Sequence, residues 1–364
     1  MQFHTEMYNL FIPPAFLIAG ASLFSFIITF FSIPSVVRVS QIKGLVAHPN
    51  GRTTHTYPTP NLGGVAIFAG VIISSVIFTG IPTAHELKYM IAAMLIIFFV
   101  GLKDDMYPMV AYKKAIGQIS AVVIIMIPGN FYVTSLHGFF GIYTIPYGLS
   151  LGLTFILFLA LINSFNLIDG IDGLASGIGI ICSVFFGIVF LKDKHLSYAI
   201  MGFILAASLL AFFYFNVLGK KNKIFLGDTG SMLIGLLLAI FAVRFMNFDS
   251  STMYFKNNAS PGVLFLVLIV PLFDTARVFL LRLLRKQSPF QADRTHIHHR
   301  LHDICGSHIK ATGIILLVNL VFILLALFLR RINNELMILL GVALATFLSY
   351  IPIFITKRRS VARN

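Results

Sequence analysis

Long apolar segments separated by short polar loops run along almost the whole chain. A helix needs about 20 apolar residues to cross the roughly 30 Å hydrocarbon core of a bilayer. The pattern therefore predicts an all-α, polytopic membrane protein with about eleven spanning helices, two of which (89–102 and 114–128) are short. The predicted spans are 11–33, 62–81, 89–102, 114–128, 148–166, 173–191, 197–218, 230–246, 261–281, 312–330 and 334–356.

No soluble domain, long linker or internal repeat interrupts this pattern, so we expect residues 1–364 to form a single transmembrane domain. The segment Met1 to Leu10 has no basic residue before the first apolar run, which argues against a cleaved signal peptide. Secondary transporters commonly carry internal repeats, so the absence of a visible repeat argues against a transporter.

The composition agrees with a membrane protein and excludes a water-soluble one. Hydrophobic residues make up 58% of the chain and charged residues only 11%, against about 25% charged in soluble domains. The net charge of +14 is of the size that nucleic-acid-binding proteins show. However, the 27 Lys and Arg lie in clusters between apolar runs. We therefore expect a membrane-lipid environment and no nucleic-acid partner.

Positive charge also predicts the orientation. If the N-terminus lies outside and the spans alternate, 19 basic residues face the cytoplasm and 6 face outside, while Arg244 and Arg277 fall within spans. This asymmetry follows the positive-inside rule and places the C-terminus in the cytoplasm. The same arrangement brings most aspartates to the cytoplasmic side, with Asp274 just inside a span near that side, which indicates a functional site there.

The strongest local motif runs from Asn163 to Leu174, between two apolar runs. Asn166, Asp169 and Asp172 recur every three residues, so in a helical or tightly turned backbone they project to one side. Its glycines permit close approach of a ligand or a neighbouring helix. The alternative is a helix-capping turn, because Asn, Asp and Gly all favour helix ends.

Two further acidic motifs lie at predicted helix ends. Asp104 and Asp105 suit a hard divalent cation or a carboxylate base beside one, and Lys114 follows within reach of a phosphate. The segment Gly227–Ser231 offers free backbone N–H groups for an anion and the Asp228 carboxylate for its metal. A plain capping role is the alternative for both motifs.

The longest predicted cytoplasmic loop carries a histidine and arginine cluster. His296, His298 and His299 stand beside Arg294, and both residue types donate hydrogen bonds to phosphate oxygens. A diphosphate clamp is therefore favoured over a zinc site or a basic loop that contacts anionic lipid. Arg52 and His55 in the first loop give a weaker signal.

Together these motifs resemble the polyprenyl-phosphate N-acetylhexosamine-1-phosphate transferases, glycosyltransferase family 4. The resemblance runs in matching order from about Leu45 to Leu301. The loop from Ser288 to His299 resembles the branch that transfers N-acetylglucosamine-1-phosphate to undecaprenyl phosphate. The sister branch, which acts on UDP-N-acetylmuramoyl-pentapeptide, typically has three consecutive histidines that this chain lacks.

The resemblance implies an eleven-span enzyme of the bacterial cytoplasmic membrane, with its active site on the cytoplasmic face and Mg²⁺, or alternatively Mn²⁺, as cofactor. It implies the conversion of UDP-N-acetylglucosamine and undecaprenyl phosphate to the lipid-linked diphosphate sugar and UMP. This would be the first membrane step of a cell-envelope polysaccharide pathway such as lipopolysaccharide or teichoic acid synthesis. Another UDP-N-acetylhexosamine, UDP-N-acetylmuramoyl-pentapeptide and a homodimeric assembly stay open.

The resemblance also assigns roles by motif. Asp104, Asp105 and Asp169 match catalytic residues, with Asp104 as the base that deprotonates the lipid phosphate, and Asp228 matches the metal ligand. Asn216 is a candidate contact for uracil. The residues that match substrate-binding positions are Asn166, Asp172, Lys114, Arg52, His55, Arg294, His296, His298 and His299.

The chain departs from the family pattern at two places. Pro108 stands where many relatives carry a third acid, and Ala47 stands where an aspartate is common, so joint metal binding by Asp104 and Asp105 is not assigned. Direct attack of the lipid phosphate on the β-phosphorus is favoured over a phosphorylated aspartate, because the acceptor is already an oxyanion. A transporter of nucleotide-sugar or lipid phosphate and a membrane zinc hydrolase are the rival classes.

Overall fold

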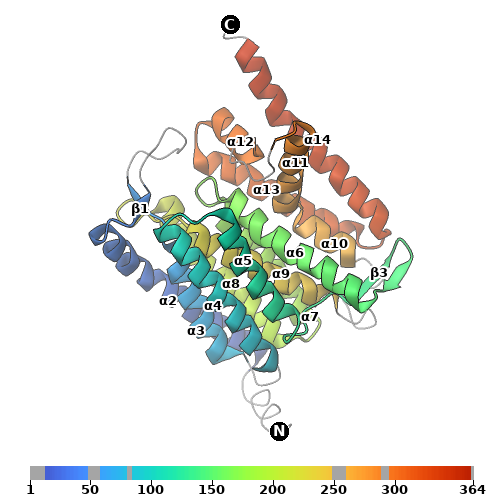
Figure 1. Ribbon diagram of the computed structural model, residues 1–364, viewed down its shortest axis with the longest axis horizontal. Coiled ribbons are helices and arrows are strands. Elements are labelled where there is room, and N and C mark those ends of the chain that lie inside the picture. The colour runs from blue at the N-terminus through green and yellow to red at the C-terminus, as the bar shows by residue number, and fades with distance from the viewer. Residues whose placement is uncertain (1–12, 48–57, 80–83, 248–259, 288–294, 362–364) are drawn as a thin grey trace.

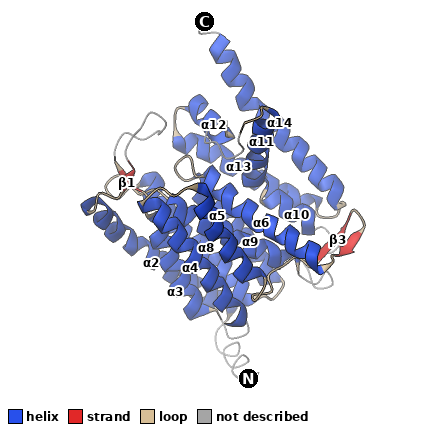
Figure 2. Cartoon of the chain, in the orientation of Figure 1, coloured by secondary structure: helices blue, strands red, loops and turns tan. Residues whose placement is uncertain are grey.

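The computed structural model describes residues 13–47, 58–79, 84–247, 260–287 and 295–361. Helices dominate these residues, and strands form only two small hairpins (Figure 2). The helices are α2 (Pro14–Ile42), α3 (Gly63–Phe78), α4 (Ala84–Met106), α5 (Ala111–Met126), α6 (Tyr147–Ile168), α7 (Leu174–Lys192), α8 (Leu196–Phe213), α9 (Gly227–Met246), α10 (Ser260–Val267), α11 (Ile269–Leu284), α12 (Ile297–Cys305), α13 (His308–Leu329) and α14 (Asn334–Val361).

Two antiparallel hairpins and a π-helical turn complete the described elements. Strand β1 (Val46–Ala47) pairs with β2 (Thr59–Pro60), and β3 (Ser135–Phe139) pairs with β4 (Ile142–Thr144). The π-helical turn Tyr214–Leu218 extends α8. Figure 1 shows β1 and β3 on opposite sides of the molecule and α14 extending away from it at the C-terminus.

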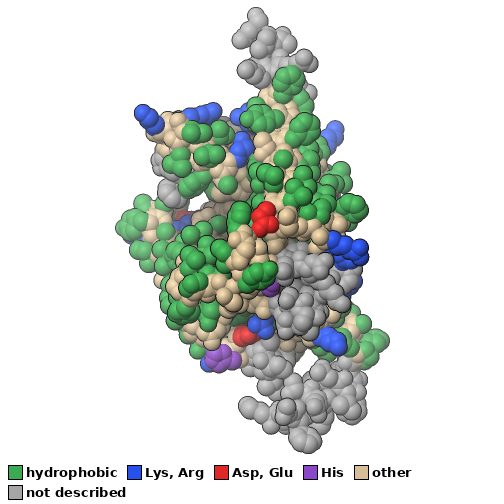
Figure 3. All heavy atoms as spheres, turned by 90° about the vertical axis from the view of Figure 1, so that its right-hand side faces the viewer, with side chains coloured by type: hydrophobic (Ala, Val, Ile, Leu, Met, Phe, Trp, Pro, Cys, Tyr) green, Lys and Arg blue, Asp and Glu red, His purple; other side chains and the backbone are tan. Residues whose placement is uncertain are grey.

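The prediction of an all-α polytopic membrane protein is confirmed. Eight of the described helices are long and apolar enough to cross a membrane, and a bent pair, α10 with α11, makes a ninth. Helices α3 and α5 are shorter, with 16 residues each. Each predicted span overlaps one of these helices, while the number of crossings and the side on which each terminus lies stay predictions. Hydrophobic side chains cover most of the described surface seen in Figure 3, as lipid contact requires.

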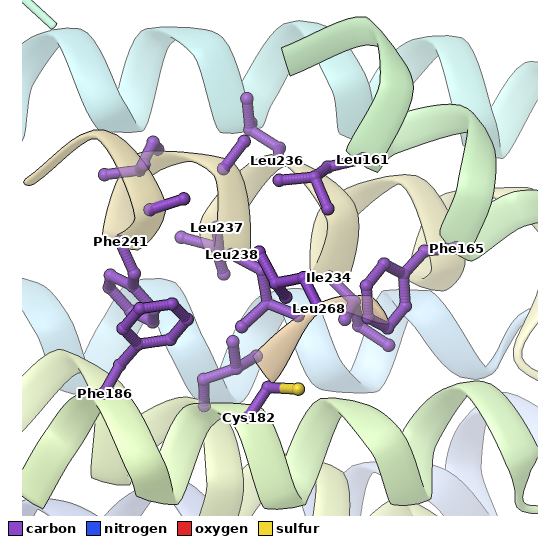
Figure 4. Packing of buried hydrophobic residues seen from close by; sticks show 14 of the residues in the cluster. Leu161, Phe165, Cys182, Phe186, Ile234, Leu236, Leu237, Leu238, Phe241 and Leu268 are labelled. Atoms are coloured by element: carbon purple, nitrogen blue, oxygen red, sulfur yellow. The ribbon is translucent and has the colours of Figure 1, made fainter. Parts of the chain in front are cut away.

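Helix α9 lies at the centre of the bundle and packs against α3, α4, α6 and α7. Almost all of its side chains are buried, because Leu, Ile, Met and Phe occur all round the helix rather than on one face. Figure 4 shows Leu236, Leu238 and Phe241 of α9 among side chains from α6 and α7. A Cβ at Gly64 of α3 or at Gly101 of α4 would collide with the first turn of α9, so these glycines allow the close contact.

The predicted span 261–281 is broken, and α10 and α11 meet at 80°. Pro271 has no N–H, so it cannot bond the carbonyl of Val267 four residues earlier. Asn319 of α13 donates to that carbonyl at 3.3 Å, and the Cys182 thiol of α7 lies 3.5 Å from it. A backbone carbonyl released inside an apolar bundle is therefore satisfied by neighbouring helices.

Candidate functional site

The predicted acidic motifs meet at one end of the bundle. The C-terminal ends of α4 and α6 and the N-terminal ends of α5, α7 and α9 come together there, because successive antiparallel helices alternate in direction. Side chains that are far apart in the sequence, such as Asp104 and Asp228, therefore lie at one site. The contributing side chains come from the ends of several different helices.

Lys114 of α5 lies at the centre of this site. Its Nζ is 3.2 Å from Oδ2 of Asp104 and donates to Asp228 Oδ2, and it also donates to Asn166 Oδ1 at 3.3 Å. One ammonium group thus holds carboxylates from α4 and α9 around a single positive charge. The predicted convergence of Asp104, Lys114, Asn166 and Asp228 is present in the structure.

Asn166, near the end of α6, fixes Asp228 from the other side. Its Nδ2 donates to Asp228 Oδ1 at 2.6 Å and to the hydroxyl of Ser231 at 3.0 Å. Asp104 is held by the backbone N–H of Met109, which donates to Oδ1 at 2.6 Å. Each of the two carboxylates that contact Lys114 is therefore also oriented by a second partner, Met109 for Asp104 and Asn166 for Asp228.

Asp105 has a different environment from Asp104. Its Oδ1 accepts the backbone N–H of Asp228 at 2.7 Å, and its Oδ2 accepts the N–H and hydroxyl of Thr229 at 3.0 and 2.6 Å. A carboxylate that accepts the first N–H groups of a helix caps it and complements its dipole. The capping alternative thus describes Asp105, although the helix it caps is α9 rather than the next helix in the chain.

Gly227 is required at this junction. Its φ is +72°, a left-handed conformation that favours glycine, and a Cβ there would collide with the Asn61 carbonyl and approach Asp105. The N–H groups of Gly63 and Gly64 donate to the carbonyls of Phe225 and Leu226, both at 2.9 Å. The start of α9, which carries Asp228, is therefore attached to both α3 and α4.

Asp169 follows the last residue of α6 and is partly buried. Within the described residues its carboxylate has no hydrogen-bond or ion-pair partner. Burial, together with the carboxylates of Asp228, Asp105 and Asp172, raises the pKa of Asp169 well above its ordinary value. A carboxylate in this environment accepts a proton more readily than an exposed one, and it can share a cation with its neighbours.

Asp172 and Asn166 contact different parts of the molecule. In Asp172, Oδ2 accepts Lys223 Nζ at 2.6 Å, the N–H donates to His308 Nδ1 at 3.1 Å, and the carbonyl accepts the Thr312 hydroxyl at 2.7 Å. These contacts dock the start of α13 on the loop between α6 and α7. Lys223 and His308 were not predicted as site residues, and only their charge and their places at loop ends could have indicated them.

Asn216 fixes the end of the same loop. Its Oδ1 accepts the N–H of Gly173 at 2.6 Å, and its Nδ2 donates to the carbonyl of Ile224 at 2.8 Å. It is 4% exposed. In the structure Asn216 therefore connects the loop after α6 to the segment that precedes α9.

The histidine cluster lies against the loop between α6 and α7. His296 and His298 are buried, and their rings stack with centroids 5.5 Å apart, while His298 and His299 lie 4.2 Å apart. A Cβ at Gly170 would collide with Nε2 of His298. Gly170 therefore makes room for His298, and the cluster packs against the residue that follows Asp169 in the sequence.

His298 is neutral at physiological pH. Burial, followed by the neighbouring His299, lowers the pKa of His298 to about 3. Neither of its ring nitrogens has a hydrogen-bond partner among the described residues. A neutral imidazole offers one donor and one acceptor.

Asp274 of α11, which lies just inside a predicted span and had no predicted role, contacts the histidine cluster. Its carboxylate lies 2.9 Å from His296 Nδ1 and 2.9 Å from Arg277 Nη2. The signal that could have identified it is the ionisable side chain within an apolar segment, which is seldom without a function. Arg52, His55 and Arg294 lie outside the described residues.

The oxygen donors around Lys114 fit a hard divalent cation. They comprise the carboxylates of Asp104 and Asp228 and the amide oxygen of Asn166, the ligand types that Mg²⁺ and Mn²⁺ prefer. The Asp169 carboxylate, which interacts electrostatically with that of Asp228, is a further oxygen donor. The observation that supports this fit is the position of the Lys114 ammonium, a cation held between two of these carboxylates.

Comparison with known proteins agrees with this arrangement. Residues 87–246 match the model of glycosyl transferase family 4, a range that includes every acidic motif of the bundle end. The decaprenyl-phosphate N-acetylglucosaminephosphotransferase of Mycobacterium tuberculosis is 31% identical over 82% of this chain and 79% of its own. The undecaprenyl-phosphate alpha-N-acetylglucosaminyl 1-phosphate transferase of Escherichia coli K12 is 32% identical over 72% and 70%.

A third relative, the probable undecaprenyl-phosphate N-acetylglucosaminyl 1-phosphate transferase of Bacillus subtilis, is 30% identical over 82% of this chain and 80% of its own. These alignments cover most of both chains, beyond the range that the family model matches. The chain belongs to glycosyl transferase family 4.

Proposed function

We propose that this protein transfers N-acetylglucosamine-1-phosphate from UDP-N-acetylglucosamine to undecaprenyl phosphate and releases UMP. The observation that carries the proposal is the Asp104–Lys114–Asp228 cluster with Asp169 beside it, at one end of a membrane bundle. Relatives that share most of the chain are named for this transfer to undecaprenyl or decaprenyl phosphate.

The site supports the chemistry of a charged diphosphate at a lipid surface. Phosphoryl transfer depends on positioning and charge neutralisation more than on covalent chemistry by the protein. Lys114 supplies positive charge, the histidines supply hydrogen-bond donors, and the aspartates supply the ligands of a metal. We place the site on the cytoplasmic face of a bacterial inner membrane, where the donor nucleotide is found.

Asp228 would hold Mg²⁺, with Asp104 across from it; Mn²⁺ is the alternative. The metal would shield the negative charge of the diphosphate. Asn166 and Ser231 orient Asp228, and Asp105 positions it through the first turn of α9. In this arrangement Asp105 acts as a positioning residue and does not touch substrate.

The geometry favours Asp169 as the proton acceptor. Both oxygens of Asp104 are engaged, one by Met109 and the other by Lys114, whereas the Asp169 carboxylate has no partner within the described residues. The proton of the lipid phosphate would pass to Asp169, the phosphate oxygen would bond to the β-phosphorus, and the bond to UMP would break. The product is the lipid-linked diphosphate sugar.

The test is an assay of the purified protein with undecaprenyl phosphate, Mg²⁺ and separate UDP-sugars, including UDP-N-acetylmuramoyl-pentapeptide. We expect UMP release with UDP-N-acetylglucosamine and loss of that release with a chelator. Absence of release with every sugar would contradict the enzyme assignment. If labelled UMP exchanges into the donor without a lipid acceptor, the reaction proceeds through a phosphorylated aspartate and not by direct attack.

A further inference from the structure

Asp274 is a buried carboxylate outside the bundle-end cluster. It is 5% exposed and lies on α11, beyond the 80° break in the span. Its Oδ2 pairs with His296 Nδ1 at 2.9 Å, and its Oδ1 accepts from Arg277 Nη2 at 2.9 Å and from the N–H of Ile297 at 3.2 Å. One buried side chain thus receives three hydrogen bonds, two of them from the histidine segment.

These bonds fix the start of α12 relative to α11. Arg277 donates to the carbonyl of Thr295 at 2.8 Å as well as to Asp274. The histidine segment is therefore held at three successive residues, through the Thr295 carbonyl, the His296 ring and the Ile297 N–H. Asp274 also caps α12, because Ile297 is the first residue of that helix.

The same contacts select one ring orientation for His296. A carboxylate beside Nδ1 requires that nitrogen to carry the proton, which leaves Nε2 as the ring atom available to a ligand. His298 stacks on His296 and lies against Gly170, in the loop that carries Asp169. A continuous set of contacts thereby connects Asp274 to the proposed active site through His296 and His298.

We propose that Asp274 is a positioning residue that acts through His296 to orient the histidine cluster toward the phosphates of the nucleotide-sugar donor. The proposal rests on the proposed function, because it assigns the donor phosphates to this cluster. It predicts that Asp274 affects use of the donor and leaves use of the lipid acceptor unchanged.

A metal site is the competing explanation for these residues. Candidate ligand atoms of Asp274, His296 and His298 all lie within 4.8 Å of one another. However, both oxygens of Asp274 already accept hydrogen bonds, and the Arg277 guanidinium would place a positive charge beside the metal. The observed bonds therefore favour positioning.

The experiment is a double-mutant cycle on the full-length enzyme with Asp274→Ala, His296→Ala and the double variant. Each single change should lower kcat/KM for the donor by about 100-fold, since a charge-assisted hydrogen bond is lost. Because both act through one contact, the double variant should lose little more than the worse single variant. Losses that multiply would overturn the proposal.

Two further measurements separate positioning from a general loss of structure. The KM for the donor should rise in Asp274→Ala while the KM for undecaprenyl phosphate stays within twofold; an equal rise of both would contradict the proposal. Asp274→Asn keeps an acceptor for His296 and should lose only about 10-fold. If the alanine variant does not fold, Asp274→Asn replaces it in the cycle.

Asp303→Asn serves as the matched control, since its side chain lies on α12 and is 54% exposed. It should keep wild-type kcat/KM. If the purified wild-type protein contains stoichiometric zinc and Asp274→Ala does not, Asp274 is a metal ligand and the positioning proposal is wrong. An inactive wild-type protein would contradict the proposed function. An active wild-type protein in which Asp274 and His296 have independent effects would contradict only the proposal for Asp274.

Discussion

At the residue scale, neighbouring acids of one motif have distinct tasks. Asp104 faces Lys114 in the centre of the site, whereas Asp105 caps α9 and holds the turn that carries Asp228. The sequence predicts that both lie near the site, because the pair stands at a span end. It cannot separate them, because the partner helix of Asp105 begins more than 120 residues later.

Asp105 and Asp104 should therefore respond differently to substitution. Asp105→Ala removes the cap of α9 and should lower the free energy of unfolding by about 1–2 kcal/mol and abolish most activity. Asp105→Asn retains one acceptor and should recover part of both. Asp104→Asn should lose activity with little change in stability. Thermal unfolding and UMP release measure the two effects, and equal destabilisation by Asp104→Asn and Asp105→Ala would contradict the distinction.

Gly170 offers a test of the contact between the histidine cluster and the aspartate loop. The added Cβ of Gly170→Ala would collide with His298, so we expect the His298 ring to move and kcat/KM to fall about 10-fold or more. Gly152→Ala in α6 is the control, because a Cβ there meets nothing within 4 Å. Wild-type kinetics in Gly170→Ala would show that the position of His298 is unimportant.

At the element scale, the break between α10 and α11 decides where Asp274 lies. Pro271 is visible in the sequence and weakens the helix, yet an uninterrupted span from 261 to 281 was predicted. The missing information is long-range: Asn319 and Cys182, from two other helices, satisfy the carbonyl that Pro271 leaves free. A single apolar pattern does not show which distant side chain will fill that role.

We expect the effects of Asn319 and Pro271 on the free energy of unfolding to be coupled. Asn319→Leu should lower the free energy of unfolding by about 1–2 kcal/mol, because the Val267 carbonyl loses its amide donor. In a Pro271→Ala background the restored N–H can bond that carbonyl, so the same change should cost less. Denaturant unfolding of the four variants in detergent measures the coupling, and a cost that is identical in both backgrounds would contradict the explanation of the break.

At the scale of the whole molecule, the apolar pattern is sufficient for the fold class and the bundle geometry gathers the site. The eleven predicted spans overlap the observed helices because lipid-facing and buried surfaces are both apolar. The small hairpins and α12 could not be predicted, since they are short and depend on tertiary contacts. Asp274 was left without a role because two of its partners, His296 and Ile297, lie more than 20 residues away.

The stability of the molecule should depend on pH through His298. Its pKa is about 3 in the folded protein and about 6.5 in an unfolded chain. The folded state therefore binds fewer protons between these values, and its stability falls as the pH is lowered below 6.5, by about 1 kcal/mol per pH unit from this group. Thermal unfolding between pH 7.5 and 4.5 measures the effect.

His298→Gln should weaken this pH dependence. His85→Gln, which changes an exposed residue at the other end of α4, should leave it unaltered. The same loss of stability on acidification in His298→Gln as in the wild type would show that His298 does not remain neutral in the folded protein.

If the proposed function holds, the β-phosphorus of the donor passes to a lipid phosphate at this site. The most direct measurement gives the purified protein undecaprenyl phosphate, Mg²⁺ and UDP-N-acetylglucosamine labelled at the β-phosphorus, and then separates lipid from water. We expect the label to enter the lipid fraction in an amount equal to the UMP released, and we expect Asp228→Asn to prevent both. Release of UMP while the label stays in the water fraction would mean that the donor is hydrolysed, and it would contradict transfer to the lipid.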